Sequence, residues 1–390
     1  MTRTNHKARP RVAVIGGGVI GLSIGWRLAS GGALVDVFER GAAGRGASWA
    51  AAGMLAAGAE VEPGESALYT LLRRSQALWP DFAAALTERS GIDIQLRTEG
   101  TITVALTQDD AARLQQTYRL QQQLGVPAQW LSRVEALERE PRLNPRLAGA
   151  VLTEGDHQVD NRLVAEALKA AFLNANGLMH EQSGDLGIRV AGNRATGVTL
   201  GGGEHDADIV IVAAGAWSPD IAGLPAAARP PVRPIKGQML ALRMDPAAPL
   251  LRHVLGTPKA YLVPRRDGRL LIGATTEEKG FDDFLTAGGI LSLLESAWRA
   301  LPGIEELPLI ESWVGFRPGS RDDAPILGPT PVDNLVLATG HHRNGILLAP
   351  VTAEIVARLV LEGQVDEALT AFSLARFAGS PERSRKWTSA

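Results

Sequence analysis

The chain has 390 residues, of which 45% are hydrophobic and 21% charged, and its formal net charge at pH 7 is −2. This near-neutral balance argues against a nucleic-acid-binding protein. Because the chain has no cysteine, disulfides, thiolate metal sites, iron–sulfur clusters and a cysteine-tethered cofactor are excluded. At about 100–200 residues per domain, the length indicates two or three domains.

The first segment with a clear pattern is an uncharged run from Val12 to Trp26 that follows several basic residues. This arrangement is typical of a secretory signal, but the run is shorter than the roughly 20 apolar residues of a spanning helix. It also contains five glycines, which are costly inside a helix. We therefore expect a buried strand, a glycine turn and a helix, in a cytoplasmic protein that makes no membrane contact.

The elements at this end form a βαβ unit. The β-branched run Val12–Ile15 predicts a buried strand, the spacing of apolar residues over Val19–Ser30 predicts a helix, and Ala33–Phe38 predicts a second strand. The next segment, Gly41–Ala59, consists almost wholly of Gly, Ala and Ser. Such a segment is either a flexible linker or a backbone that another group approaches closely.

The middle and end of the chain carry further helices and strands. Helical spacing predicts helices over Ser66–Arg89 (with Pro80 as a possible kink), Asp109–Leu124, Asp160 or Asn161 to about Ala175, Gly289–Ala300 and about Val351–Leu361. Strands are predicted over Ile94–Leu106, up to Val212, from Pro230 to Thr276 with a hairpin at Arg266–Arg269, near Leu309–Phe316, and over Asn334–Ala338. A nucleotide-binding layer interleaved with an antiparallel sheet explains this order best.

The segment Gly16-Gly17-Gly18-Val19-Ile20-Gly21 matches the dinucleotide fingerprint G-x-G-x-x-G. Its glycines permit a tight turn and a close approach of the backbone to a pyrophosphate, which the following helix attracts with its positive end. Glu39 lies 39 − 16 = 23 residues after Gly16, where a carboxylate accepts ribose hydroxyls and repels the 2′-phosphate of NADP. The fingerprint does not separate NAD from FAD. Its place in the chain and a downstream strand that ends at Ala213-Ala214-Gly215 favour FAD. We expect this downstream strand to run back beside the first one, with its small residues near the nucleotide.

Seven segments together resemble the D-amino-acid oxidase family of FAD enzymes, and within it the glycine oxidases of thiamine biosynthesis. They are VAVIGGGVIGLSIGWRLA, SWAAAGMLAAGAE, ADIVIVAAGAWS, PIKGQMLAL, AYLVPRRDGRLLIGAT, SWVGFRPGSRDDAPILG and ATGHHRNGILLAPVTAEIV. The first is generic to flavoproteins, whereas the combination of GFRPG with GHHRNGILLAP is specific to this branch. The seven segments extend in order from residue 12 to about residue 356.

The resemblance implies four catalytic residues. Arg317 of GFRPG would hold the substrate carboxylate through two parallel hydrogen bonds, and Tyr261 would add a hydroxyl donor. Arg343 would lie near the substrate and Met54 at the flavin and the active site. Each assignment has a structural alternative: Arg317 could pair with Asp322 or Asp323 at the surface, and Tyr261 and Met54 could fill the core.

The resemblance also implies which residues meet the cofactor, a non-covalent FAD. They are Gly16, Gly18, Val19, Ile20, Gly21, Glu39, Arg40, Ala47, Ser48, Ala52, Gly53, Met54, Gly215, His341, His342, Arg343, Asn344, Gly345, Ile346 and Leu347. The helix after GHHRNG would direct its positive end at the flavin C2 carbonyl. We expect no metal at His341 and His342, since no carboxylate has ligand spacing to them.

The implied activity is hydride transfer from the α-carbon of glycine to flavin N5, with O2 as acceptor, giving glyoxylate, ammonia and peroxide and supplying the imine for thiazole synthesis. Thr276 stands where the family pattern has a methionine, so sarcosine, small N-alkyl glycines or small D-amino acids also remain possible substrates. Other possibilities are an amino-acid dehydrogenase that reduces a membrane acceptor, a subunit of a cyanide-forming glycine dehydrogenase, and a non-catalytic nucleotide-binding module. The resemblance implies a homo-oligomer, and from the composition and the absence of an amphipathic anchor we expect no nucleic-acid or membrane partner.

The predicted fold is therefore α/β, with a Rossmann-like FAD-binding domain and an interleaved α+β substrate domain built on an antiparallel sheet. We assign residues 1–88, 150–228 and 320–376 to the first domain, and residues 89–149 and 229–319 to the second. Residues 377–390 form a polar tail.

Overall fold

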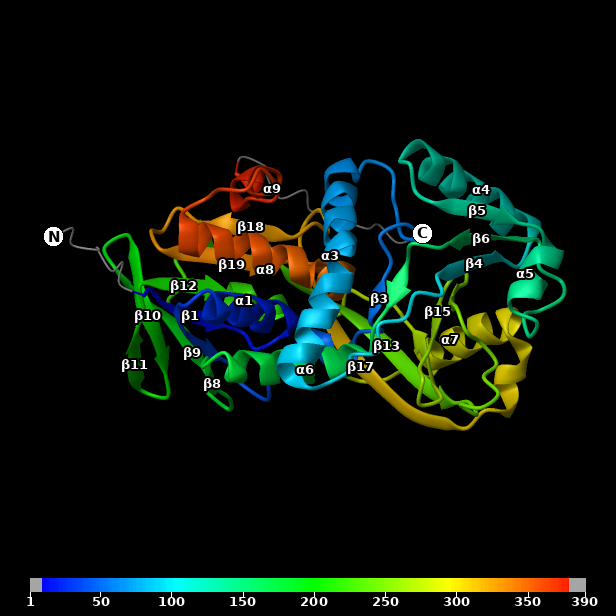
Figure 1. Cartoon of the computed structure of the whole chain (residues 1–390), viewed down its shortest axis with the longest axis horizontal. Helices are drawn as coiled ribbons and strands as arrows, with labels where there is room; N and C mark the ends of the chain where they lie inside the picture. Colours follow the sequence, from blue (N-terminus) through cyan, green and yellow to red (C-terminus); the bar gives the residue numbers. More distant parts are fainter. Residues whose placement is uncertain (1–8, 379–390) are drawn as a thin grey trace.

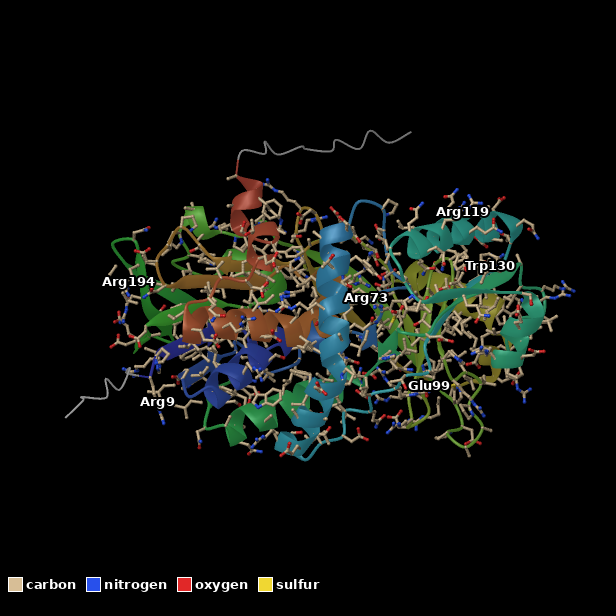
Figure 2. All side chains as sticks on the ribbon, turned by 45° about the horizontal axis from the view of Figure 1, so that its top comes forward. Arg9, Arg73, Glu99, Arg119, Trp130 and Arg194 are labelled. Carbon is tan, nitrogen blue, oxygen red and sulfur yellow. The ribbon has the colours of Figure 1, made fainter. Side chains whose placement is uncertain are left out.

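The computed structural model describes residues 9–378, which form two regions side by side along the long axis of the molecule (Figure 1). Arg194 and Arg119 lie in the two different regions, toward opposite ends of the molecule (Figure 2). Each region is built on its own large sheet, and the chain passes repeatedly between the two. The predicted combination of a Rossmann-like layer and an interleaved antiparallel sheet is confirmed.

The first region has a six-stranded sheet in the order β18-β19-β12-β1-β2-β8. Its strands are parallel except for β18, which pairs antiparallel with β19. The predicted return of the strand near residue 210 to the side of the first strand is confirmed, because Val12 aligns with Ile209. The strands are β1 (Arg11–Ile15), β2 (Leu34–Phe38), β8 (Leu178–His180), β12 (Ile209–Val212), β18 (Ile326–Pro329) and β19 (Leu335–Thr339).

Helices cover one face of this sheet and a small antiparallel sheet covers the other. The helices bury apolar side chains against the sheet and against one another in one core; they are α1 (Val19–Ser30), α3 (Ser66–Ser90), α6 (Asn161–Asn174) and α8 (Gly345–Glu362). On the other face, Ala13, Ile15 and Phe38 of the large sheet pack with apolar residues of the small one. The small sheet consists of β9 (Leu186–Ala191), β10 (Arg194–Leu200) and β11 (Gly203–Asp206). The short helix α9 (Ala368–Ala371) follows α8.

The second region has an eight-stranded sheet in the order β17-β13-β16-β15-β14-β4-β6-β5, in which only β14 and β4 pair in parallel. The strands are β4 (Thr101–Ala105), β5 (Ala128–Leu131), β6 (Gly149–Thr153), β13 (Arg233–Arg243), β14 (Val254–Gly256), β15 (Tyr261–Pro264), β16 (Arg269–Gly273) and β17 (Leu309–Gly319). Helices α4 (Gln108–Gln123), α5 (Arg133–Arg139) and α7 (Ala287–Ala300) pack against it. The predicted hairpin joins β15 to β16.

Several predicted boundaries differ from those of the structure. The last long helix begins at Gly345 rather than near Val351, although Pro350 lies inside it. Ser75 of α3 stabilises this part of the helix, because its hydroxyl donates to the Leu347 carbonyl (2.6 Å) and accepts from Val351 N–H (3.4 Å). The strand predicted over residues 94–106 shortens to β4, and α3 continues through Pro80.

One described helix, spanning His342–Glu362, is long and apolar enough to cross a membrane by length and composition. Its most apolar window is 67% buried inside the protein, as expected of a core helix.

The proposed domain division needs one adjustment, since β6 (149–153) pairs with β4 and β5 although a boundary was predicted at residue 150. We propose that the second domain continues through Thr153. The tail from residue 379 onward lies outside the described residues.

Candidate active site

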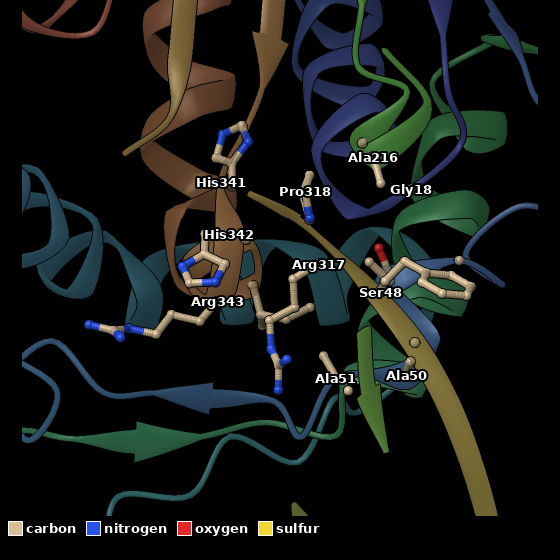
Figure 3. Close-up of a pocket in the computed structure, with 18 of the residues that line it drawn as sticks. Gly18, Ser48, Ala50, Ala51, Ala216, Arg317, Pro318, His341, His342 and Arg343 are labelled. Atoms are coloured by element: carbon tan, nitrogen blue, oxygen red, sulfur yellow. The ribbon is translucent and has the colours of Figure 1, made fainter. Parts of the chain in front are cut away.

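A cavity of about 1340 Å³ extends from the glycine fingerprint of the first region to the eight-stranded sheet of the second. Figure 3 shows Arg317, His342 and Arg343 together around one part of it, with Gly18 and Ser48 farther along. Of the residues predicted to meet cofactor or substrate, all but Gly21 and Leu347 line this cavity. Gly21 packs beneath the fingerprint turn, and Leu347 is buried inside α8.

The fingerprint glycines have no room for side chains. Gly16 has φ +110°, and a Cβ there would lie 2.4 Å from the Ala213 carbonyl oxygen. A Cβ on Gly21 would lie 1.9 Å from the Gly16 carbonyl oxygen. These contacts hold the start of α1 close to β1 and β12, so that main chain rather than side chain faces the cavity.

The N-terminus of α1 points its backbone donors toward the cavity. Gly18 is the N-cap and supplies no side-chain cap. Val19 N–H donates to the Ser48 hydroxyl (2.8 Å), which brings Ser48 from the glycine-rich segment onto the helix terminus. The positive end of the helix dipole at this position favours a negatively charged group such as a pyrophosphate.

Glu39, at the end of β2, fastens the fingerprint turn. Its carboxylate accepts hydrogen bonds from Gly17 N–H (2.8 Å) and Gly41 N–H (3.0 Å). The neighbouring Arg40 places its guanidinium 4.0 Å from the ring centroid of Trp217, and both residues line the cavity. Trp217 was not among the residues predicted to meet the cofactor. Its position shortly after β12 and Ala213-Ala214-Gly215 is the sequence signal that could have identified it.

The small-residue segment 41–59 is not a free linker. It forms the short helix α2 (Ala47–Ala50) and β3 (Met54–Leu55), which pairs with β7 (His157–Gln158). A Cβ on Gly53 would lie 2.1 Å from the Val159 carbonyl oxygen, and one on Gly58 2.6 Å from Thr153. The alternative of a closely approached backbone is therefore the correct one.

Arg317 lies on β17 with its guanidinium largely unengaged. Its Nη1 donates to the Thr275 carbonyl (3.1 Å), and it has no ion pair within residues 9–378. The surface alternative fails, because Asp322 pairs with Arg376 (2.8 Å) and the nearest cationic or imidazole group to Asp323 is His342 (3.7 Å). Gly237 on β13 leaves space for the fork, since a Cβ there would lie 2.8 Å from Nη1.

Tyr261, on β15, faces the same part of the cavity. Burial raises the pKa of its hydroxyl, while the positive charge of Arg317 lowers it. Met54 and Thr276 also line this part, and Met54 packs with Met239 and Trp313 in a small apolar cluster. Arg317, Tyr261, Met54 and Thr276 come from separate strands and loops and converge only in the folded chain.

Arg343 lines the cavity at the predicted place, but acidic groups surround it. The acceptors around its guanidinium are Glu62 Oε1 (2.7 Å), Glu60 Oε2 (3.3 Å), the Glu60 carbonyl (3.1 Å) and Glu65 Oε2 (3.9 Å). It therefore connects the segment 60–65 to the loop before α8 and is less available than Arg317 for a second carboxylate.

The two histidines before α8 are separately placed. His341 is buried, with Nε2 3.1 Å from the Thr352 hydroxyl, and burial lowers its pKa to about 3. His342 has φ +46° and faces the cavity. Burial, reinforced by the charges of Arg317 and Arg343, lowers the pKa of His342 to about 4. Both imidazoles are thus neutral near pH 7.

These features fit a dinucleotide cofactor: a side-chain-free turn, a helix N-terminus and a terminal carboxylate lie at one end of a large cavity. The sequence profile described as FAD dependent oxidoreductase matches residues 11–359. The chain belongs to this family of FAD-dependent oxidoreductases. It is accordingly a flavoenzyme, with FAD as its cofactor.

Comparison with individual proteins shows which members of this family the chain resembles. The chain is 41% identical over 373 residues to a glycine oxidase of Geobacillus kaustophilus, covering 94% of this chain and 97% of that protein. The crystal structure of glycine oxidase from Geobacillus kaustophilus superposes with a TM-score of 0.86 at 40% identity, covering 94% and 99% of the two chains. A bifunctional protein ThiO/ThiG of Trichormus variabilis is 36% identical over 369 residues, which cover 94% of this chain and 55% of that longer protein.

Proposed function

We propose that this flavoenzyme oxidises the C–N bond of glycine and of small N-alkyl glycines or D-amino acids. The observation that carries the proposal is the unengaged guanidinium fork of Arg317 beside Tyr261 in the cofactor cavity. The relationship to glycine oxidases over nearly the full chain supports it. The products would be glyoxylate, ammonia and, with O2 as acceptor, hydrogen peroxide.

Arg317 would bind the substrate carboxylate through two parallel charge-assisted hydrogen bonds, and the Tyr261 hydroxyl would donate a third. Such a clamp restricts the rotation of a small amino acid and fixes which Cα hydrogen faces the cofactor. Arg317 suits this role because no carboxylate pairs with its guanidinium within residues 9–378, and Nη1 donates to a backbone carbonyl, that of Thr275.

Two helix termini and the glycine-rich segment would hold FAD. The N-terminus of α1 and Glu39 suit the pyrophosphate and the adenosine ribose, and the backbone from Ala47 to Gly53 suits the flavin. The N-terminus of α8, which begins at Gly345 beside the cavity, provides a positive field that favours a reduced, anionic flavin. When bound, FAD supplies the redox step by accepting the substrate hydride.

The substrate range follows from the cavity wall at Thr276. A threonine is shorter than the methionine of the family pattern and carries a hydroxyl, so the wall recedes at this point. We propose that N-methyl and N-ethyl glycines are accepted beside glycine. A role in supplying the imine for thiamine thiazole synthesis is supported by the relationship to the ThiO/ThiG proteins. The cytoplasmic location, the homo-oligomeric state and O2 as the acceptor also stay predictions.

The first test is the visible spectrum of the purified protein, followed by glycine, sarcosine and D-alanine under air and without it. We expect a flavin spectrum that bleaches anaerobically and about one peroxide per substrate oxidised under air. Bleaching without peroxide would favour the dehydrogenase that uses another acceptor. A flavin that no amino acid bleaches would contradict the proposal.

The second test concerns Arg317 itself. Arg317→Ala should raise the glycine KM by about 100-fold or more, as expected for loss of a charge-assisted pair, while FAD stays bound. Arg321→Ala provides a control, because this exposed arginine lies on the same segment outside the cavity. Equal kinetics for Arg317→Ala and the wild type would exclude Arg317 as the carboxylate-binding residue.

A further inference from the structure

The segment that follows β3 brings a carboxylate, Glu60, to the substrate end of the cavity. Its side chain is 30% exposed and lines the cavity wall. The proposed function assigns no role to this group. Its position is well determined, because three separate contacts hold the segment on which it lies.

The first contact is with Arg343, whose Nε lies 3.3 Å from Glu60 Oε2 and whose Nη2 donates to the Glu60 carbonyl (3.1 Å). The other two lie just before Glu60 in the chain. Buried Asp156 accepts from Gly58 N–H (2.8 Å) and Ala59 N–H (2.7 Å), and Gln121 Nε2 donates to the Gly58 carbonyl (3.1 Å). Both the backbone and the side chain of Glu60 are therefore restrained.

Glu60 is electrostatically coupled to both residues that would hold the substrate carboxylate. Burial raises the pKa of Glu60, and the positive charges of Arg343 and then Arg317 oppose that rise. The negative charge of Glu60 in turn contributes to the raised pKa of Tyr261, after burial. The guanidinium, the phenol and the carboxylate all line the same cavity.

The other acidic residues of the cavity wall are placed differently. Glu39 is bound to the fingerprint turn at the cofactor end. The Glu62 side chain is 56% exposed, and Asp323 lies against His342. Asp185 and Asp220 line the wall beside elements of the nucleotide-binding region. Within residues 9–378, Glu60 is thus the acidic cavity residue coupled to Arg317 and Tyr261.

An α-amino acid arrives mostly as a zwitterion, with a carboxylate and an ammonium group on one carbon. Arg317 and Tyr261 complement its carboxylate, and a carboxylate nearby complements its ammonium group. From this arrangement we infer that Glu60 binds the ammonium group of the substrate and accepts one of its protons. The inference rests on the proposed function and assigns that reaction a residue for the amine.

The proton transfer prepares the oxidation. One N–H bond of the ammonium group breaks, the proton moves to a Glu60 oxygen, and the bond pair stays on nitrogen as a lone pair. That lone pair becomes the second C–N bond as Cα loses its hydrogen with its electron pair to the bound cofactor. The imine leaves as a cation, and Glu60 releases its proton to solvent before the next turnover. A carboxyl with a raised pKa is a better acceptor than an ordinary one at neutral pH.

The groups that set the ionisation of Glu60 come from several elements. They are Arg343 before α8, Arg317 on β17, Tyr261 on β15, Asp156 beside β7, and Glu62 and Glu65 on its own segment. The positive charge of Arg343 opposes the rise in the pKa of Glu60 that burial causes, and its contact fixes the position of the carboxylate. This assigns Arg343 a positioning role in place of direct substrate binding.

The test is the pH profile of kcat/KM for glycine in the Glu60→Gln holoenzyme. Glutamine preserves size but neither attracts a cation nor accepts a proton. At pH 7 we expect kcat/KM of the variant to fall by about 100-fold, which is within the usual contribution of a positioned acid or base. Above about pH 9.5, where much of the dissolved substrate is already the neutral amine, the variant should approach the wild type. A purely structural defect would reduce the rate at every pH.

Two controls separate this role from an effect through Arg343 or Arg317. Glu62→Gln removes another carboxylate from Arg343 but keeps Glu60, so it should retain the wild-type shape of the pH profile and lose far less kcat/KM at pH 7 than Glu60→Gln. Acetate, a carboxylate without an amine, should perturb the flavin spectrum of Glu60→Gln with nearly wild-type affinity. Glu60→Asp retains a carboxylate and should keep the wild-type shape of the pH profile with a reduced rate.

A pH-independent loss in Glu60→Gln, an equal loss in Glu62→Gln, or weakened acetate binding would each overturn the inference. Unchanged kinetics in Glu60→Gln would do so as well. Inactivity of the wild type toward every amino acid would instead contradict the proposed function, so the two failures are distinguishable. FAD content measured for each variant shows that the cofactor site is intact.

Discussion

Asp156 offers a direct test of how the segment before Glu60 is held. Its side chain is 1% exposed, and its two oxygens accept from Gly58 N–H (2.8 Å), Ala59 N–H (2.7 Å) and Gln76 Nε2 (3.3 Å). Burial nevertheless outweighs these hydrogen bonds and raises the pKa of Asp156 to about 7. We predict that Asp156→Asn removes a large part of the dependence of stability on pH.

The sign follows from linkage between protonation and folding. The folded-state pKa lies above the unfolded value of about 3.9, so the folded protein binds the proton more tightly. The resulting stability is fully present below about pH 4 and is lost as pH rises through about 7. Three pKa units correspond to about 4 kcal/mol in total, of which about 2.5 kcal/mol is lost between pH 5 and pH 8.

The assay is thermal unfolding of the apoprotein at pH 5 and pH 8 and constant ionic strength. A chain of this length has an unfolding entropy of about 0.8 kcal/mol/K, so the loss corresponds to about 3 °C in Tm. Between pH 5 and pH 8, the Tm of the wild type should fall by about 3 °C more than the Tm of Asp156→Asn. Asp245→Asn, which changes an exposed carboxylate bound to one backbone N–H (2.9 Å), should behave as the wild type. Equal pH dependence in the wild type and Asp156→Asn would refute the reasoning.

Two further predictions concern the cofactor turn and the contact between the two regions. Glu39→Ala removes both acceptors that fasten Gly17 and Gly41, so the variant should retain several-fold less FAD after dialysis; an unchanged flavin content would count against this role. Arg265→Met removes donors to Gln158, Ala52 and Asn161 at a side chain that is 2% exposed. We expect the free energy of unfolding of this variant to fall by about 3–5 kcal/mol, which corresponds to a fall of about 4–6 °C in Tm. A Tm equal to that of the wild type would contradict this expectation.

The sequence by itself determined the elements whose signals are local. The helix over Val19–Ser30 has the predicted bounds, because a glycine turn and apolar spacing define it without distant contacts. The strand near residue 210 also lies beside the first strand as expected, and the structure shows that the two pair in parallel. The strand predicted near Leu309–Phe316 is present and continues through Arg317 as β17, and the structure places the Arg317 side chain in the cavity.

Tertiary contacts decided the features that local patterns could not encode. Ser75, far away in the sequence, supports the start of α8 around Pro350, so that helix begins earlier than its own residues suggest. The close approach of Val159 to Gly53 turns a segment that reads as a linker into part of the cavity wall.

The same holds for the charges of the site. The resemblance places both Arg317 and Arg343 at the substrate, but Glu60, Glu62 and Glu65 surround Arg343, whereas Arg317 retains a largely unengaged guanidinium. Which arginine is available to a substrate therefore depends on where acidic groups lie in space. Local sequence determined which groups could ionise or form a turn; packing determined which of them were desolvated, paired or left facing the cavity, because burial and charge pairing act through distance in space and not along the chain.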